Sequence, residues 1–152
     1  MRGEREDCLP QVRGYGFSMN AAELFDRAKA AAAKAYAPYS HFHVGCALLT
    51  AQGNIFSGCN VENASYGLTI CAERAAVCAA VAAGEREIVA VAIATDLVDP
   101  ARPCGACRQV LAEFGIGMQV ALVGRGGVRV DTTLASLLPD PFTFGDVYRG
   151  QQ

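Results

Sequence analysis

The alternation of apolar and polar residues divides this chain into helices and short strands. In the first amphipathic segment apolar residues recur at helical spacing on one side, at Leu24, Phe25, Ala28, Ala32 and Tyr36. Asn20 precedes Glu23 by three residues, which is the spacing of an N-terminal capping box. Pro38 follows, and the residue before a proline is disfavoured in a helix. The pattern therefore predicts a helix over residues 21–36.

Apolar runs bounded by turn-forming residues predict β-strands. These runs are residues 42–50, 55–57, 88–94, 118–123 and 128–131. Residues 51–54 have turn composition, so the first two strands should form a hairpin. The glycine-rich stretch 124–127 lies between strands, with no helix or Lys-Ser/Thr pair behind it. It therefore predicts a hairpin turn and not a phosphate-binding loop.

Two cysteine-containing motifs each precede a helical stretch. Alanine-rich sequence follows Cys71-Ala72-Glu73-Arg74 as far as Gly84, and a second helical stretch follows Pro103-Cys104-Gly105-Ala106-Cys107 as far as Gly115. A glycine just past the last periodic residue is a common helix stop. A short leucine-rich helix, capped by Thr132 or Thr133, should end before Pro139.

The order of these elements predicts an α/β fold with three layers, α/β/α. Alternating strands and helices after a hairpin give a mixed five-stranded sheet between helices. The strand–helix–strand units should be right-handed crossovers with parallel strands. Both cysteine motifs then begin helices at the carboxyl ends of strands, where α/β sheets bind their ligands.

Composition narrows the class of protein. The chain has 152 residues, 52% of them hydrophobic, and a formal net charge of −2. This size predicts one domain over residues 19–152, with residues 1–18 as a flexible tail. No basic run favours a nucleic-acid partner, and no apolar run is long enough for a membrane helix. Residues 1–11 lack the apolar core of a secretory signal, so the seven cysteines indicate reduced thiols in the cytoplasm.

Three thiols, those of Cys71, Cys104 and Cys107, lie at the two predicted helix starts. The backbone N–H groups and the positive end of the helix dipole favour thiolates there, and thiolates bind zinc. Three protein ligands leave a fourth position for water, as in catalytic zinc sites. Glu73 shares the first turn with Cys71 and can reach that water without being a ligand. A carboxylate in this place suits general acid–base chemistry.

The same cysteines permit two other interpretations. A Cys-x-x-Cys pair could be a thiol redox pair, or part of a structural zinc site closed by a fourth cysteine. Cys78 lies about 10 Å further along the helix axis than Cys71, at about 1.5 Å per residue, and Zn–S bonds of about 2.3 Å cannot span that gap. Cys46 and Cys59 stay open as a fourth ligand.

The paired motif resembles that of the zinc-dependent nucleoside deaminases. Cys71-Ala72-Glu73 followed by Pro103-Cys104-Gly105-Ala106-Cys107 is similar to the three-cysteine branch, which contains the small cytidine deaminases. The resemblance covers residues 21–142. It implies the cytidine deaminase-like α/β/α fold, one Zn²⁺ per chain and hydrolysis of the 4-amino group of cytidine or deoxycytidine in pyrimidine salvage. Glu73 would carry the protons.

The resemblance also implies a binding site for the nucleoside. Asn60 and Glu62 would hold the 3′-hydroxyl of the sugar, the ring of Phe42 would line the pyrimidine pocket, and the backbone N–H of Ala72 would bind the base carbonyl. The alternatives are a solvated loop with an Asx-turn at Asn60 and core packing of Phe42. From strand-like alternation, Asn60 and Glu62 should point the same way and Val61 into the protein.

Arg74 could compensate the negative charge of the zinc-bound thiolates. Zinc with three thiolates carries a formal charge of −1, which opposes ionisation of a bound water, and a nearby guanidinium would withdraw that charge. The family's arginine at this position is thought to act in this way. The alternative is an ordinary surface arginine.

In the tetrameric deaminases that this chain resembles, a Phe at the position of Phe142 reaches into a neighbouring subunit's site, and a Tyr at the position of Tyr66 lies at the subunit junction. The resemblance therefore implies a homotetramer with shared active sites. Otherwise Phe142 packs on its own core or stays mobile. Blasticidin S deaminase is a rival within the class, but it lacks the Asn-x-Glu pair. A structural-zinc or thiol-redox module is the rival from another class.

Overall fold

The computed structural model describes residues 17–145. The helices, including two short 3-10 turns (η), are α1 Phe17–Ala32, η1 Tyr66–Leu68, α2 Ala72–Ala82, α3 Gly105–Gly115, η2 Arg125–Gly127 and α4 Leu134–Leu137. The strands are β1 Val44–Thr50, β2 Ile55–Cys59, β3 Ile88–Thr95, β4 Gln119–Val123 and β5 Arg129–Thr133. All five predicted strands are present, with ends that differ by a few residues.

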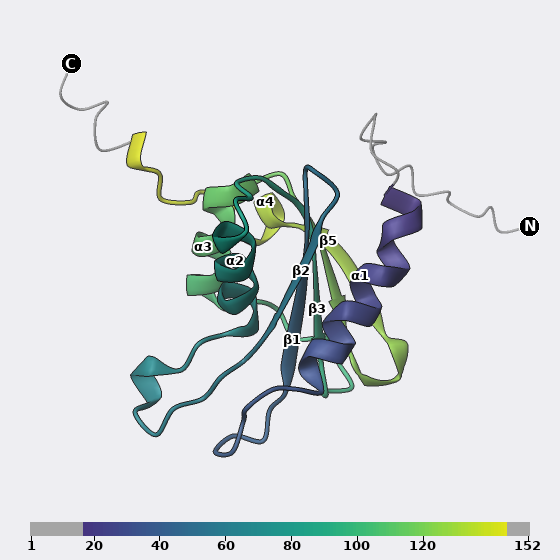
Figure 1. The fold of residues 1–152 in the computed structure, drawn as a ribbon, viewed down its shortest axis with the longest axis vertical. Helices are drawn as coiled ribbons and strands as arrows, with labels where there is room; N and C mark the ends of the chain where they lie inside the picture. Colours follow the sequence, from purple (N-terminus) through teal and green to yellow (C-terminus); the bar gives the residue numbers. More distant parts are fainter. Residues whose placement is uncertain (1–16, 146–152) are drawn as a thin grey trace, which may run out of the picture.

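The strands form one mixed sheet in the order β2-β1-β3-β4-β5. Strands β3 and β4 are parallel, and the other neighbouring pairs are antiparallel. Figure 1 shows α1 on one face of the sheet and α2, α3 and α4 on the other. The predicted three-layer α/β/α fold is confirmed.

Alternate residues of the central strands supply the two halves of the core. Larger side chains face α2 and α3, and these include Leu48, Val91, Ile93, Val120 and Leu122. The face under α1 is lined mainly by alanines, including Ala47, Ala90, Ala92 and Ala94, which pack against Leu24 and Ala28. Small residues on this face let α1 lie close to the sheet.

The β4–β5 turn and the cap of α4 both agree with the sequence predictions. Strands β4 and β5 pair on either side of residues 124–127, so this stretch is a hairpin connection. Gly126 and Gly127 have φ angles of 84° and 86°, a region that glycine adopts without strain. Thr133 caps α4, and its hydroxyl oxygen accepts a hydrogen bond from Ser136 N–H at 3.2 Å.

The limits predicted for the first helix are wrong at both ends. Helix α1 begins at Phe17, so Asn20 lies inside the helix and not at its start. A capping residue stabilises a helix by only about 1 kcal/mol, and the additional helical turn outweighs this preference. The helix ends at Ala32, and the backbone N–H of Tyr36 donates instead to the carbonyl oxygen of Asn60 at 3.0 Å. Of the predicted tail, residues 1–16 lie outside the described residues, and the last two belong to α1.

Two glycines allow helices to touch the sheet. A Cβ atom on Gly45 of β1 would lie 2.0 Å from the carbonyl oxygen of Ala28 in α1. A Cβ atom on Gly58 of β2 would lie 2.4 Å from the backbone nitrogen of Ala76 and 2.8 Å from the carbonyl oxygen of Ala72, both in α2. The first turns of α2 therefore rest directly on the end of β2.

In the part of the chain that the structure describes, none of the helices is both long and apolar enough to cross a membrane.

We expect Gly58→Ala to lower the free energy of unfolding by about 1–3 kcal/mol, because the added methyl group overpacks a contact between two backbones. For a chain of this size the midpoint of thermal unfolding should fall by about 2–4 °C for each kcal/mol. Gly117→Ala is the matched control, since nothing lies within 4 Å of a Cβ atom there. Equal midpoints for the two variants would contradict the close packing of α2 on β2.

Candidate active site

The metal-binding residues meet because two strands end at the same edge of the sheet. Strands β2 and β3 are both antiparallel to β1, so their carboxyl ends lie together beside the first residues of β1. Cys71 and Cys104 are the residues immediately before α2 and α3, and Cys107 lies in the first turn of α3. All three sulfur atoms lie within 4.8 Å of one another.

This donor set fits zinc. Zinc–sulfur bonds are about 2.3 Å long, so two sulfurs on one tetrahedral zinc lie roughly 4 Å apart. The three sulfurs already have about this spacing, and thiolates are ligands that zinc prefers. Within residues 17–145, no other Cys, His, Asp or Glu belongs to the group.

The structure removes the candidates for a fourth cysteine ligand. Cys46 is completely buried in the core, and burial raises the pKa of its thiol well above the usual value. The Cys59 thiol lies 3.6 Å from the carbonyl oxygen of Lys34. Neither side chain joins the three sulfurs, so the described residues form an open site with three ligands.

Arg74 lies against the thiol of Cys71. Its Nη2 atom is 3.5 Å from the sulfur of Cys71 and 3.3 Å from the carbonyl oxygen of Thr69. The pKa of Cys71 falls to about 5, because the Cys107 thiol and then the Arg74 guanidinium stabilise its thiolate against partial burial. The pKa of Cys107 is raised, first by its hydrogen bond to Cys71 and then by burial. Of Cys71 and Cys107, Cys71 is therefore the first to become a thiolate.

Glu73 is a buried carboxyl group beside the sulfurs. Its side chain belongs to the first turn of α2, and the residue is only 4% exposed. Burial raises its pKa, and the neighbouring Cys71 thiolate adds to the effect. A carboxyl group that exchanges its proton nearer to neutral pH is suited to proton transfer.

Asn60 holds the segment that carries Phe42. Its Nδ2 atom donates to the Phe42 carbonyl oxygen at 2.8 Å, and its Oδ1 atom accepts from the Val44 N–H at 2.9 Å. The predicted orientation of Val61 is wrong, because Val61 is 43% exposed and Asn60 only 8%. Val61 forms backbone bridges to Tyr36 and Ile70, which turn its side chain outwards.

Glu62 fixes the loop before Phe42. Its Oε2 atom accepts hydrogen bonds from the backbone N–H groups of Tyr39, at 2.9 Å, and Ser40, at 3.3 Å, and its Oε1 atom bonds the Ser40 hydroxyl. The Ser40 hydroxyl and these N–H groups lower the pKa of Glu62. The Ser40 oxygen in turn accepts from the Phe42 N–H at 3.1 Å. No pattern in the sequence indicated this role of Ser40.

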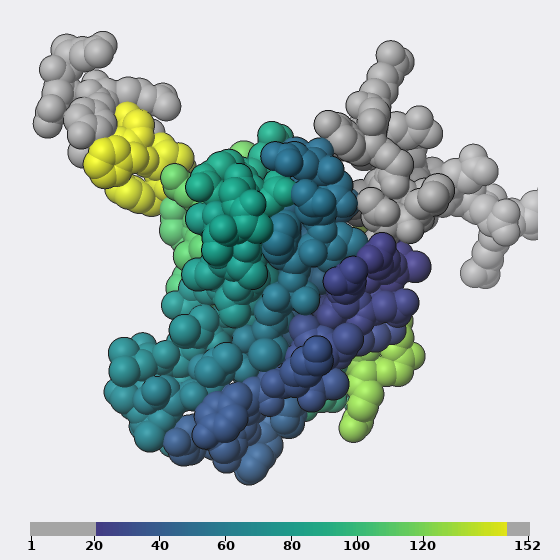
Figure 2. All heavy atoms as spheres, in the orientation of Figure 1, coloured from purple at the N-terminus to yellow at the C-terminus, as the bar shows by residue number. Residues whose placement is uncertain are grey.

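The other predicted site residues differ in exposure. Ala72 is completely buried and begins α2, where backbone N–H groups have no partner within the helix. Tyr66 is 75% exposed, and its ring makes an edge contact with Tyr39 at 6.0 Å. Phe142 is 63% exposed. Figure 2 shows the loops 36–43 and 60–70, in blue and teal, side by side at the lower edge.

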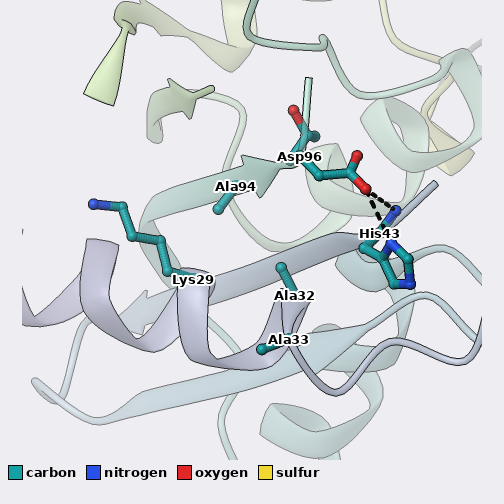
Figure 3. Close-up of a pocket in the computed structure, with 7 residues that line it drawn as sticks. Lys29, Ala32, Ala33, His43, Ala94 and Asp96 are labelled. Carbon is teal, nitrogen blue, oxygen red and sulfur yellow. Dashed lines mark hydrogen bonds and ion pairs between the residues drawn. The ribbon is translucent and has the colours of Figure 1, made fainter. Parts of the chain in front are cut away.

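A separate hollow of about 400 Å³ lies between the end of α1, His43 and the end of β3 (Figure 3). The ring Nδ1 of His43 lies 2.9 Å from the Oδ2 of Asp96, and the His43 backbone N–H donates to the same oxygen at 3.3 Å. The hollow is lined by Lys29, Ala32, Ala33, His43, Ala94, Thr95 and Asp96, none of them a predicted site residue. The His43–Asp96 pair, which sequence reasoning missed, ties Phe42's neighbour to the β3–α3 connection.

The fold and the site together define the class of protein: an α/β/α sandwich in which two helix starts bring three cysteines and a glutamate together. The family described as the cytidine and deoxycytidylate deaminase zinc-binding region matches residues 19–123. This chain belongs to that family.

Individual relatives agree over most of the chain. A cytidine deaminase of Sporosarcina psychrophila is 46% identical over 136 residues, which cover 88% of this chain and all of the relative. One of Mycobacterium tuberculosis is 46% identical over 83% of this chain and 92% of the relative. The crystal structure of the Burkholderia pseudomallei cytidine deaminase has a TM-score of 0.76 and 51% identity, covering 80% of this chain and 98% of that one.

We expect Asp96→Asn to destabilise the protein at pH 7 but not in acid. Partial burial opposes ionisation of Asp96, but the hydrogen bonds from His43 outweigh it and lower the pKa. The contribution of the carboxylate is therefore present above about pH 3.9, the ordinary aspartate pKa, and is lost as the pH falls through the folded-state pKa. Since the pair is substantially exposed, the loss at pH 7 should be about 0.5 kcal/mol.

Urea unfolding of wild type and Asp96→Asn between pH 7 and pH 3 measures this difference. Asp99→Asn is the matched control, because Asp99 is an exposed carboxylate on the same connection. A difference between wild type and Asp96→Asn that stays constant across this range would contradict the charge interaction.

Proposed function

We propose that this protein hydrolyses cytidine and deoxycytidine to uridine and deoxyuridine and releases ammonia. The observation that carries the proposal is the group of three cysteine sulfurs within 4.8 Å of one another, with the buried carboxyl group of Glu73 on the adjoining helical turn. The names of the relatives support the same activity.

Cys71, Cys104 and Cys107 would hold one Zn²⁺ per chain. Zinc in such a site lowers the pKa of water, so that a nucleophile is available near neutral pH. Glu73 would take one proton from that water and deliver it to ring N3 as the oxygen adds to C4. Glu73 would then take the remaining proton from the added oxygen and deliver it to the amino group, which leaves as ammonia while the C4 oxygen becomes a carbonyl. One carboxyl group therefore serves first as base and then as acid.

Arg74 would balance the charge of the thiolates. Its guanidinium lies beside the Cys71 sulfur, at 3.5 Å, and withdraws charge from it. Substitution by an uncharged residue would leave the formal charge of −1 on zinc with three thiolates uncompensated, which opposes formation of the nucleophile.

The nucleoside would lie between Phe42 and the start of α2. The ring of Phe42 gives the base an apolar wall, and the Ala72 N–H donates to its carbonyl oxygen. Asn60 uses one N–H of its amide within the chain, so the second N–H can donate to the 3′-hydroxyl. Glu62 accepts three hydrogen bonds and keeps capacity for one more.

The rival functions fit the structure less well. Blasticidin S deaminase shares the cysteines but lacks the Asn-x-Glu pair that this chain carries at Asn60 and Glu62. A structural zinc site would be closed by a fourth ligand, and a redox pair needs only two of these three thiols. Neither of the last two uses a buried carboxyl group such as Glu73.

We further propose a homotetramer with shared sites, in which Phe142 and Tyr66 act on the neighbouring subunit. Their exposure of 63% and 75% supports contact outside their own chain. A role in pyrimidine salvage fits the substrate. A cytoplasmic location is supported by the free thiols of all six cysteines among the described residues.

The activity is tested by ammonia release from cytidine, deoxycytidine, dCMP, adenosine and blasticidin S, with zinc measured on the same sample. We expect turnover of the first two only, with about one zinc per chain. Glu73→Gln should keep the zinc and lose at least about 10³-fold in kcat, because an amide cannot carry the proton. Cys104→Ala should lose the zinc and, with it, stability.

Activity without bound metal, or in Glu73→Gln at more than a few per cent of wild type, would contradict the mechanism. Turnover of blasticidin S in preference to cytidine would favour the rival deaminase. Zinc without turnover of any of the five compounds would favour a structural site.

Sharing of sites is tested by mixing two variants, each with reduced activity. Glu73→Gln lacks the proton carrier but keeps Phe142, and Phe142→Ala is the reverse. After dissociation and reassembly, hybrid tetramers should contain sites with an intact Glu73 and a neighbour's Phe142, so activity should exceed the sum of the two separate variants. Hybrids verified by mass spectrometry that gain no activity would place Phe142's action within its own chain.

A further inference from the structure

The side chain of Gln109 pairs with both backbone groups of Phe142. Its Nε2 atom donates to the Phe142 carbonyl oxygen at 2.8 Å, and its Oε1 atom accepts from the Phe142 N–H at 3.1 Å. A primary amide has a donor and an acceptor side by side, so it binds a residue's backbone much as a neighbouring strand does. The two bonds fix the orientation of this backbone as well as its position.

The preceding residue, Arg108, anchors the base of the same segment. Its Nη1 atom donates to the carbonyl oxygen of Leu137 at 2.8 Å, and its Nε atom donates to that of Pro103 at 2.8 Å. Between the two anchors lie Pro139 and Pro141, whose rings restrict the backbone. Residues 137–142, which we name the arm, are therefore held at both ends and stiff between them.

The arm holds an aromatic ring in solvent. Phe142 is 63% exposed although its backbone is fixed. In Figures 1 and 2 the yellow C-terminal segment stands out from the body beside α3. Burial of a phenylalanine ring is favourable, so a rigid backbone that leaves the ring exposed is preorganised for a contact outside its own chain.

We propose that Gln109 is a positioning residue, which holds Phe142 at the orientation in which its ring enters the neighbouring subunit's site. The inference rests on the proposed role of Phe142 in a shared site. A free arm would have to be ordered each time it closed a site, and Gln109 removes that cost in advance. Gln109 therefore acts on substrate binding without touching the substrate.

The test is a double-mutant cycle of Gln109→Leu and Phe142→Ala, followed by steady-state kinetics with cytidine. Leucine is similar in size to glutamine and removes both hydrogen bonds. We expect Gln109→Leu alone to raise KM about 5- to 30-fold, the factor for losing bonds of this kind, and to change kcat by less than about twofold. In the Phe142→Ala background the same change should alter KM by less than about twofold, because no ring is left to position.

Two further variants complete the design. Gln109→Glu keeps an acceptor for the Phe142 N–H and loses the donor, so its KM should lie between those of wild type and Gln109→Leu. Gln52→Leu, in the exposed β1–β2 turn, is the matched control and should be unchanged. Zinc content should be equal in all variants.

The outcomes separate this inference from the function on which it rests. If Phe142→Ala raises KM but Gln109→Leu does not, positioning by Gln109 is overturned and the role of Phe142 stands. If Phe142→Ala has wild-type kinetics, the shared site itself is wrong. Equal losses from Gln109→Leu in both backgrounds would show that Gln109 acts by another route, and they would also overturn the inference.

Discussion

The site depends on the direct contact between α2 and β2. Gly58 lets the backbone of the helix's first two turns touch the strand, where a Cβ atom would come within 2.4 Å of Ala76 nitrogen. Because β2 and β3 end at the same edge, this contact brings the start of α2 beside the start of α3. The positions of the three sulfurs therefore depend on contacts between backbones. Rotation of side chains cannot change these contacts.

Electrostatic effects shift the pKa values of Cys71 and Glu73 in opposite directions. The neighbouring Cys107 thiol and then Arg74 favour the thiolate of Cys71, while burial favours the protonated carboxyl group of Glu73. Titratable groups whose pKa values are pushed apart in one place can act as ligand and as proton carrier at the same pH. Asn60 and Glu62 add rigidity, since their hydrogen bonds hold the loop before β1 without any ligand.

Local sequence patterns predicted the helices and strands well. They predicted the orientation of side chains in loops poorly. Strand positions followed from apolar runs because such runs must be buried, and Thr133 was predicted as one of two possible caps by its hydroxyl. Val61 was expected to point inwards by strand alternation, but its backbone bridges to Tyr36 and Ile70 turn it outwards. The residue pattern of one segment carries no information about the distant backbone groups with which that segment pairs.

The sequence by itself determined the layers of the fold, the three cysteines and the glutamate, because periodicity and motif spacing are local properties of the chain. Only the tertiary structure decided that Cys46 and Cys59 stay away from the sulfurs, that Asn60 clamps the segment around His43, and that Gln109 holds the backbone of Phe142. These contacts join residues 16 to 33 positions apart. Their partners are chosen by the paths of the strands and helices, which place distant backbone groups within hydrogen-bonding distance.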